Sequence, residues 1–204
     1  MVLPAPPQAA VDEIAAFGRF AADRGWVPAT AGNFSRRVDA RHIAITRSGV
    51  DKGNLSCADL ALLSIDEPIP AGISAEAPLH LARYLTDSTA GAVLHVHTVA
   101  TTVVSRLYER AGSVVTEGYE MHKALGLDTH ESTLENPVFR NDQDTAKLAD
   151  DVEAKLGAAG DALPAFLLAG HGIYAWGATV ADARRHIEAV EFILACHLEE
   201  RRQR

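Results

Sequence analysis

Cysteine is almost absent from this sequence, which contains only Cys57 and Cys196 among its 204 residues. Two thiols so far apart cannot supply the disulfide framework of a small secreted protein, so we expect both to be reduced and structural. Long apolar runs are also missing, because none reaches the ~18 residues that a membrane helix needs. Residues 1–7 lack the basic and apolar segments of a secretory signal. The sequence therefore predicts a cytoplasmic protein without a membrane partner.

Positive charge is scarce as well. The chain carries 19 Lys and Arg residues against 27 Asp and Glu residues, which gives a formal net charge of -8. A nucleic-acid-binding surface needs a basic stripe that neutralises phosphates, so we expect no nucleic-acid partner. Hydrophobic residues make up 48% of the chain and charged residues 23%, which is a globular composition. We expect a single domain over residues 1–204, large enough to bury a full core.

Hydrophobic spacing predicts an alternation of helices and strands. The expected helices cover 11–24, 76–85, 98–107, 119–125, 142–156 and a final segment capped by Thr179. The expected strands cover 34–38, 42–46, 92–96, 113–115, 165–168 and 173–176. The first two strands are joined by a short turn and the last two flank a tight Gly-His-Gly break, so we expect substantial antiparallel pairing. The sequence thus predicts an α/β fold with α/β/α layering rather than a doubly wound parallel sheet.

His95 and His97 form the strongest local signal, because two residues separated by one position on a strand point to the same face. His171 lies between Gly170 and Gly172, which allow a sharp turn into a crowded site. The histidine pair alone would as readily line a polar face, and the Gly-His-Gly sequence alone would be an ordinary turn. Together the three imidazoles match an open catalytic zinc site with three protein ligands. Three imidazoles also suit iron, manganese or cobalt.

Two carboxylates flank the histidine pair in the sequence, and either Glu76 or Glu120 could transfer protons beside a catalytic metal. The alternative for each is a solvated carboxylate at the start of a helix, where the helix dipole favours it. Three loops rich in glycine and small hydroxyl residues, at 30–35, 46–52 and 74–75, favour phosphate recognition through exposed backbone N–H groups. Each loop alone is usually a simple turn, so the indication comes from three of them preceding one metal motif.

Several short motifs occur together along the chain. They are Gly32-Asn33-Phe34-Ser35, Ser48-Gly49 with Lys52, Ser74-Ala75-Glu76 with Leu79-His80, the stretch 92–98, Tyr119-Glu120-Met121 with Lys123-Ala124-Leu125, 136–139 with 141–144, and 170–177. With these motifs the sequence resembles, nearly from end to end, the class II aldolase and adducin superfamily. The Tyr-Glu-Met and Asn-Asp-Gln-Asp stretches resemble the branch of that superfamily that dehydrates methylthioribulose 1-phosphate.

The resemblance implies a three-layer α/β/α fold with a largely antiparallel central sheet, assembled as a homotetramer with sites at subunit boundaries. It also implies one Zn2+ per subunit on His95, His97 and His171. Glu120 would be the acid/base, and Glu76 would serve as a base or metal partner, with the division of labour between them open. The implied phosphate cradle consists of Gly32, Asn33, Ser48, Gly49, Lys52, Ser74 and Ala75.

The implied reaction, part of methionine salvage, removes water from 5-methylthioribulose 1-phosphate to give 2,3-diketo-5-methylthiopentyl 1-phosphate. Zinc would polarise the C2 carbonyl and Glu120 would protonate the departing C4 hydroxyl, whereas the group that removes the C3 proton stays open. A sugar-phosphate aldolase or pentulose-phosphate epimerase on the same scaffold is the first alternative, and a metal-free, adducin-like interaction module is the second. The remaining histidines, His80 among them, are expected in ordinary hydrogen bonds. His130 is the one that could approach the substrate.

Overall fold

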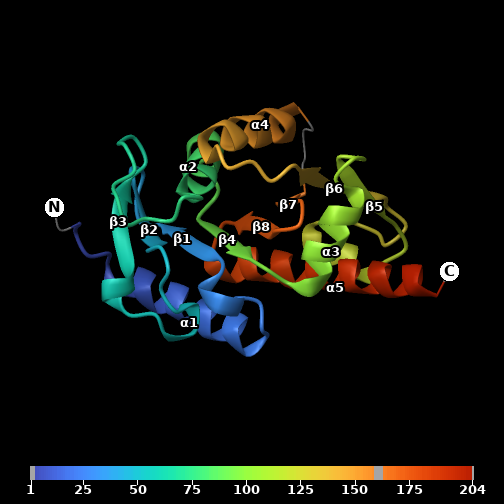
Figure 1. Cartoon of the computed structure of the whole chain (residues 1–204), viewed down its shortest axis with the longest axis horizontal. Coiled ribbons are helices and arrows are strands. Elements are labelled where there is room, and N and C mark those ends of the chain that lie inside the picture. Colours follow the sequence, from blue (N-terminus) through green and yellow to red (C-terminus); the bar gives the residue numbers. More distant parts are fainter. Residues whose placement is uncertain (1–2, 159–162, 204) are drawn as a thin grey trace.

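An eight-stranded sheet runs through the computed structural model, which describes residues 3–158 and 163–203 (Figure 1). The strand order is β3-β2-β1-β4-β8-β7-β6-β5. Neighbouring strands are antiparallel except for the parallel pair β6 and β7. The strands are β1 (Asn33–Arg37), β2 (His42–Thr46), β3 (Leu60–Ser64), β4 (Ala92–Val96), β5 (Ser113–Thr116), β6 (Leu134–Phe139), β7 (Ala165–Leu168) and β8 (Gly172–Gly177). The expected largely antiparallel sheet is therefore confirmed.

Helices cover both faces of this sheet (Figure 1). The α-helices are α1 (Gln8–Asp23), α2 (Ala77–Thr86), α3 (Val99–Tyr108), α4 (Thr145–Ala158) and α5 (Val180–Arg202), and the 3-10 turns are η1 (Pro28–Thr30), η2 (Lys52–Asn54), η3 (Cys57–Asp59) and η4 (Glu120–Leu125). α1, α3 and α5 contribute to one buried core, and α2 and α4 contribute to the core on the opposite face. The α/β/α layering is thus confirmed. Within residues 3–158 and 163–203, no helix is long and apolar enough to cross a membrane.

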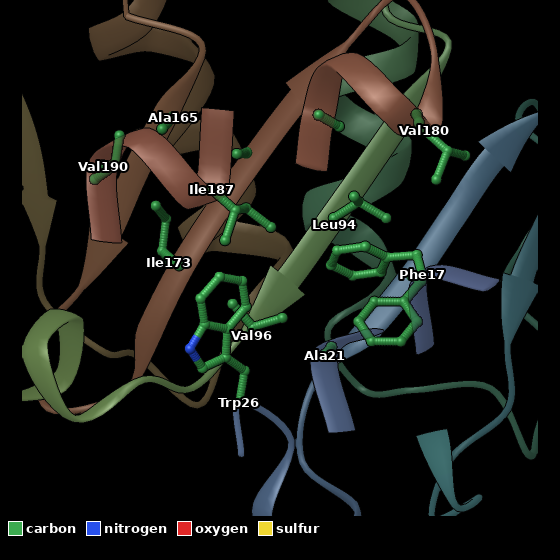
Figure 2. Close-up of a cluster of buried hydrophobic side chains, with 14 of the residues drawn as sticks. Phe17, Ala21, Trp26, Leu94, Val96, Ala165, Ile173, Val180, Ile187 and Val190 are labelled. Atoms are coloured by element: carbon green, nitrogen blue, oxygen red, sulfur yellow. The ribbon is translucent and has the colours of Figure 1, made fainter. Parts of the chain in front are cut away.

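The two central strands, β4 and β8, are held between these cores. Leu94 of β4, Ile173 of β8 and Ile187 of α5 are each 0% exposed in the core shown in Figure 2. Burial of one such side chain contributes roughly 1.5–3 kcal/mol to stability. Because successive strand residues point to opposite faces, Val93 and His95 face the other side of the sheet, where Val93 packs in the core beneath α2 and α4.

The sequence pattern does not predict β3 and β6. β3 is a short, mostly apolar run without clear alternation, and β6 contains Pro137, which cannot donate a ladder hydrogen bond. β6 tolerates the proline because it pairs with β7 beyond that position, through Val138 and Phe139. The helix starts also differ, since α1 begins at Gln8 instead of residue 11 and α2 begins at Ala77.

Candidate functional site

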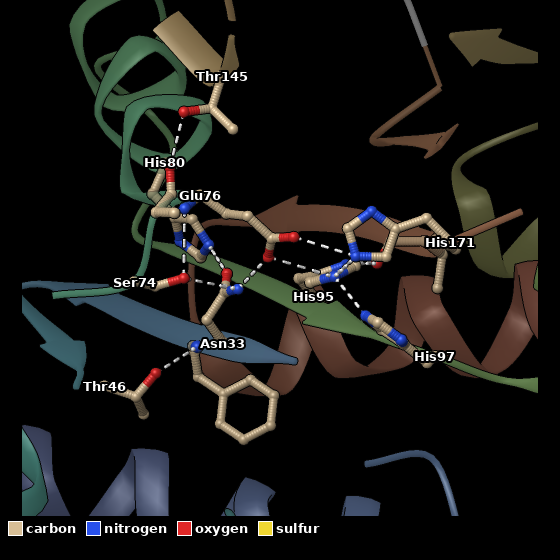
Figure 3. A network of polar contacts seen from close by, with 12 residues as sticks. Asn33, Thr46, Ser74, Glu76, His80, His95, His97, Thr145 and His171 are labelled. Atoms are coloured by element: carbon tan, nitrogen blue, oxygen red, sulfur yellow. Dashed lines mark hydrogen bonds and ion pairs between the residues drawn. The ribbon is translucent and has the colours of Figure 1, made fainter. Parts of the chain in front are cut away.

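Three adjacent strands bring polar side chains from distant parts of the chain to one place on the sheet. Asn33 of β1 is paired with His95 of β4, and His95 is paired with Tyr174 of β8. His97 follows the end of β4, and His171 lies in the turn between β7 and β8. Figure 3 shows the three histidines pointing toward one another. The predicted metal ligands are therefore neighbours in space.

The Gly-His-Gly turn explains how His171 reaches this place. Gly170 adopts a positive φ of 67°, which glycine tolerates best. At Gly172 an added Cβ would lie 2.2 Å from the carbonyl oxygen of Val96, so β8 passes β4 too closely for any side chain there. Thr102 donates a hydrogen bond of 2.9 Å to the carbonyl of His171 and fixes the turn against α3. The two glycines thus allow the chain to place the imidazole of His171 beside the other two.

The three imidazoles fit a divalent transition metal. The Nε2 atoms of His95 and His97 are 2.9 Å apart, and those of His95 and His171 are 3.3 Å apart. One nitrogen from each ring lies within 4.8 Å of the other two. Nδ1–H of His95 donates to the carbonyl of Ile173 at 2.9 Å, so the lone pair of Nε2 faces the other rings. A backbone partner of this kind is the usual outer hydrogen bond of a metal-binding histidine.

The surroundings keep two of these rings in the neutral form that binds metal. Burial lowers the pKa of His95 well below its usual value and lowers the pKa of His97 to about 4. The ring of Tyr174 stacks on His95 with centroids 4.0 Å apart and closes the site on the β8 side. Burial, reinforced by the Glu76 carboxylate, raises the pKa of Tyr174, so its hydroxyl stays protonated.

Glu76 lies against the same imidazoles. Its Oε1 is 3.0 Å from Nε2 of His171, and its Oε2 is 3.5 Å from Nε2 of His95. Nδ2 of Asn33 donates to Oε2. Burial alone would raise the pKa of this carboxyl, but the hydrogen bonds with His171 and Asn33 hold the pKa well below its usual value. Glu76 is therefore an ionised carboxylate held beside the candidate metal ligands.

A polar cavity of about 250 Å³ opens next to Glu76, His97 and His171. Its lining includes the whole set that the resemblance assigns to phosphate binding: Gly32, Asn33, Ser48, Gly49, Lys52, Ser74 and Ala75. Lys52 is only 2% exposed, and its Nζ donates to the carbonyls of Thr30 at 2.8 Å and Val50 at 2.9 Å. These two bonds take two of its three N–H donors. Burial lowers the pKa of Lys52.

Glu120, the expected acid/base, lies elsewhere in this chain. Its side chain is 71% exposed, and it pairs with Nζ of Lys123 at 2.7 Å and with Nδ1 of His130 at 3.5 Å. Neither Glu120 nor His130 is among the described residues that line the cavity. The chain thus brings Glu76, and not Glu120, to the three histidines.

Two residues at or behind the cavity were not among the site residues chosen from the sequence. Arg47 lines the cavity and belongs to the 46–52 loop expected to recognise phosphate, but it was not assigned to the phosphate cradle. His80, for which the sequence predicts only an ordinary hydrogen bond, contacts Asn33 directly behind Glu76. The signal for His80 was its position four residues after Glu76, because such residues share one helix face.

The chain is similar to known proteins in both sequence and fold. The sequence model of the class II aldolase and adducin N-terminal domain matches residues 12–198. A protein named methylthioribulose-1-phosphate dehydratase from Bradyrhizobium sp. (strain BTAi1) is 48% identical over 198 residues, which are 95% of this chain and 92% of that protein. A protein of the same name from Sorangium cellulosum (strain So ce56) is 46% identical over 193 residues, with coverages of 92% and 91%. The crystal structure of L-fuculose-1-phosphate aldolase from Thermus thermophilus has a TM-score of 0.77 at 25% identity, and covers 96% of this chain and 95% of that one.

Proposed function

We propose that the chain, which belongs to the class II aldolase and adducin family, removes water from 5-methylthioribulose 1-phosphate and gives 2,3-diketo-5-methylthiopentyl 1-phosphate. This reaction would make it a carbon–oxygen lyase of methionine salvage. The observation that carries the proposal is the meeting of three imidazole nitrogens within 4.8 Å of one another beside a polar cavity. The relatives named methylthioribulose-1-phosphate dehydratase, at 46% and 48% identity, indicate the substrate.

The proposed cofactor is one Zn2+ per subunit, held by His95, His97 and His171. When bound, this ion supplies Lewis-acid polarisation of a substrate carbonyl oxygen. The donor set supports zinc, because three neutral imidazoles with an open position are characteristic of catalytic zinc sites.

The phosphate end of the substrate would occupy the cavity beside Lys52. A buried ammonium with one N–H donor beyond its two carbonyl bonds is suited to a phosphate oxygen, because a charge-assisted hydrogen bond is stronger in a site with little water. The turns at Gly32, Ser48-Gly49 and Ser74-Ala75 line the same cavity and would add backbone and hydroxyl donors. Asn33 lines it too, but its amide is engaged by Glu76 and His80, so its part in the cradle would be to shape the turn.

Two carboxylates divide the proton transfers in this proposal. Glu76, ionised and next to the imidazoles, would take the proton from C3 of the substrate. The electrons of the C3–H bond form the C3–C4 double bond as the C4–O bond breaks. Glu120 of the partner subunit would protonate the leaving C4 hydroxyl, a contribution of ~10²–10⁴-fold for a general acid. Water leaves, and the enol tautomerises to the diketone.

A homotetramer in the cytoplasm, with Glu120 completing the site across a subunit boundary, is the proposed assembly. Two observations support it. Glu120 is 71% exposed and lies outside the described lining of this chain's own cavity. One face of α3 carries Val99, Val103 and Leu107, which are 78%, 36% and 53% exposed at spacings of four residues. An apolar stripe of this kind is typical of a surface that another subunit covers.

The test is incubation of the purified, zinc-loaded protein with 5-methylthioribulose 1-phosphate, followed by product analysis by NMR. We expect the diketone, and we expect a chelator to abolish its formation. L-Fuculose 1-phosphate, the substrate in the name of the structural relative, serves as the alternative. Release of dihydroxyacetone phosphate without any diketone would replace the dehydratase with an aldolase. If zinc-loaded protein acts on neither compound, an interaction module becomes the better account.

A further inference from the structure

A buried series of polar side chains extends from Glu76 into the space between the sheet and α2, and Figure 3 shows its first part, from Glu76 through Asn33 to His80. Nδ2 of Asn33 contacts Glu76, and Oδ1 of Asn33 contacts Nε2 of His80. Nδ1 of His80 is 2.7 Å from Oγ of Ser35, which is 2.9 Å from the hydroxyl of Tyr84. Apart from Glu76, these residues are at most 3% exposed. Each polar atom in the series therefore depends on its neighbour rather than on water.

The donors and acceptors of this series can be assigned in one direction. Nδ2 of Asn33 donates to Oε2 of Glu76, which leaves Oδ1 of the same amide turned toward His80. An amide oxygen only accepts, so Nε2 of His80 carries a hydrogen. In a neutral ring Nδ1 then accepts, and Ser35 donates to it. Tyr84 in turn donates to Ser35. Ser35 could instead donate to the carbonyl of Val93, but that contact is longer, at 3.4 Å.

His80 remains neutral in this position. Burial lowers its pKa to about 4, although the charge of Glu76 acts in the opposite direction. Its ring is enclosed by Asn33, Ser35 and the edge of Tyr174, whose centroid lies 5.8 Å away. A neutral ring with Nδ1 occupied by Ser35 has a single tautomer. That tautomer is the one that can donate to Asn33.

We propose that His80 is a positioning residue that aims the Glu76 carboxylate through Asn33, and that Ser35 and Tyr84 select the tautomer it needs. Without the donor on His80, the Asn33 amide can rotate and present its oxygen to the carboxylate. Two oxygens facing each other repel, so Glu76 would leave its place beside His171. This inference rests on the proposed function, in which Glu76 takes a proton from the substrate.

The first experiment compares two substitutions of His80 in the zinc-loaded protein. His80→Leu removes the donor, and we expect kcat to fall ~10–100-fold, as for other outer-shell partners of metal sites, with zinc content and KM nearly unchanged. His80→Gln places an amide N–H near the position of Nε2–H, and we expect it to recover most of the lost kcat. His186→Leu is the matched control, because it removes a 2.7 Å ring hydrogen bond to the Trp176 carbonyl from α5. We expect it to leave kcat unchanged.

A fall of kcat that is equal in His80→Leu and His80→Gln, or an unchanged kcat in His80→Leu, would overturn the proposal. If His80→Leu does not fold, Ser35→Ala takes its place, because it removes the hydrogen that selects the tautomer. We then expect a smaller loss of kcat with KM unchanged, and an unaltered kcat in that variant would speak against the series.

The second experiment needs no substrate. Long-range proton–nitrogen NMR correlations of the ¹⁵N-labelled protein distinguish the two nitrogens of a neutral imidazole, and His80→Gln identifies the signals of His80. We expect a proton on Nε2 and none on Nδ1. The opposite tautomer, or an average of both, would refute the arrangement. A wild-type protein that dehydrates nothing would end the proposed function, whereas the tautomer would still decide whether His80 holds Asn33.

Discussion

Replacing His80 with glutamine should change how the stability of the protein depends on pH. In the folded chain burial lowers the pKa of His80 to about 4, against 6.5 for an exposed imidazole. Between these values the unfolded chain binds a proton that the folded chain does not, so acid favours unfolding. The stabilisation linked to a neutral His80 is therefore present above pH 6.5 and is lost as the pH falls toward 4. From pH 7 to pH 5 this one group should lower the free energy of unfolding by about 2 kcal/mol.

Glutamine has no such proton equilibrium, so the comparison isolates His80 from the other titrating groups, which both proteins share. The free energy of unfolding would be measured by urea titration at pH 7 and pH 5, with protein and zinc concentrations held constant. We expect the wild type to lose about 2 kcal/mol more than His80→Gln over this interval. Parallel losses in the two proteins would mean that His80 is not held neutral in the folded state, and the assigned hydrogen-bond series would fail.

Three further substitutions test separate parts of the site. Gly172→Ala would place a Cβ 2.2 Å from a backbone oxygen, and we expect it to cost ~1–3 kcal/mol in urea unfolding and to lower zinc affinity; a variant as stable as the wild type would contradict the close approach of β8 to β4. Lys52→Met should raise KM ~10–100-fold with kcat less affected, because a charge-assisted hydrogen bond to phosphate is lost. Inorganic phosphate should also inhibit the Lys52→Met variant less than the wild type. Glu120→Gln should cripple turnover while zinc stays bound, with the exposed neighbour Glu117→Gln as the control; near-normal turnover of Glu120→Gln would remove Glu120 from the mechanism.

The histidine centre could be anticipated from the sequence because local geometry determines most of it. Two histidines one residue apart on a strand share a face whatever the rest of the fold does. The glycines around His171 indicate a turn with a positive φ and a close backbone approach, and both occur. The resemblance to the class II aldolase family is confirmed by the family model over residues 12–198, and the predicted layering is confirmed as well.

The positions of the two glutamates could not be predicted in this way. Both stand near the start of an expected helix, and only the tertiary fold decides that Glu76 meets His171 whereas Glu120 faces solvent. His80 was missed for a related reason. Its spacing from Glu76 indicates a common helix face. Its partner Asn33, however, lies on β1, and only the pairing of β1 with β4 in the folded sheet brings Asn33 next to His80. Strands β3 and β6 escaped prediction because a short apolar run and a run containing proline carry little periodicity.

The most direct test of the metal centre is X-ray absorption at the zinc edge on protein loaded with one equivalent of Zn2+. The geometry of His95, His97 and His171 predicts three imidazole nitrogens at ~2.0–2.1 Å from the metal, completed by an oxygen ligand. His171→Ala should reduce the imidazole count by one. A spectrum with one imidazole or none, or with a sulfur ligand at ~2.3 Å, would contradict the convergence of the three histidines on one ion.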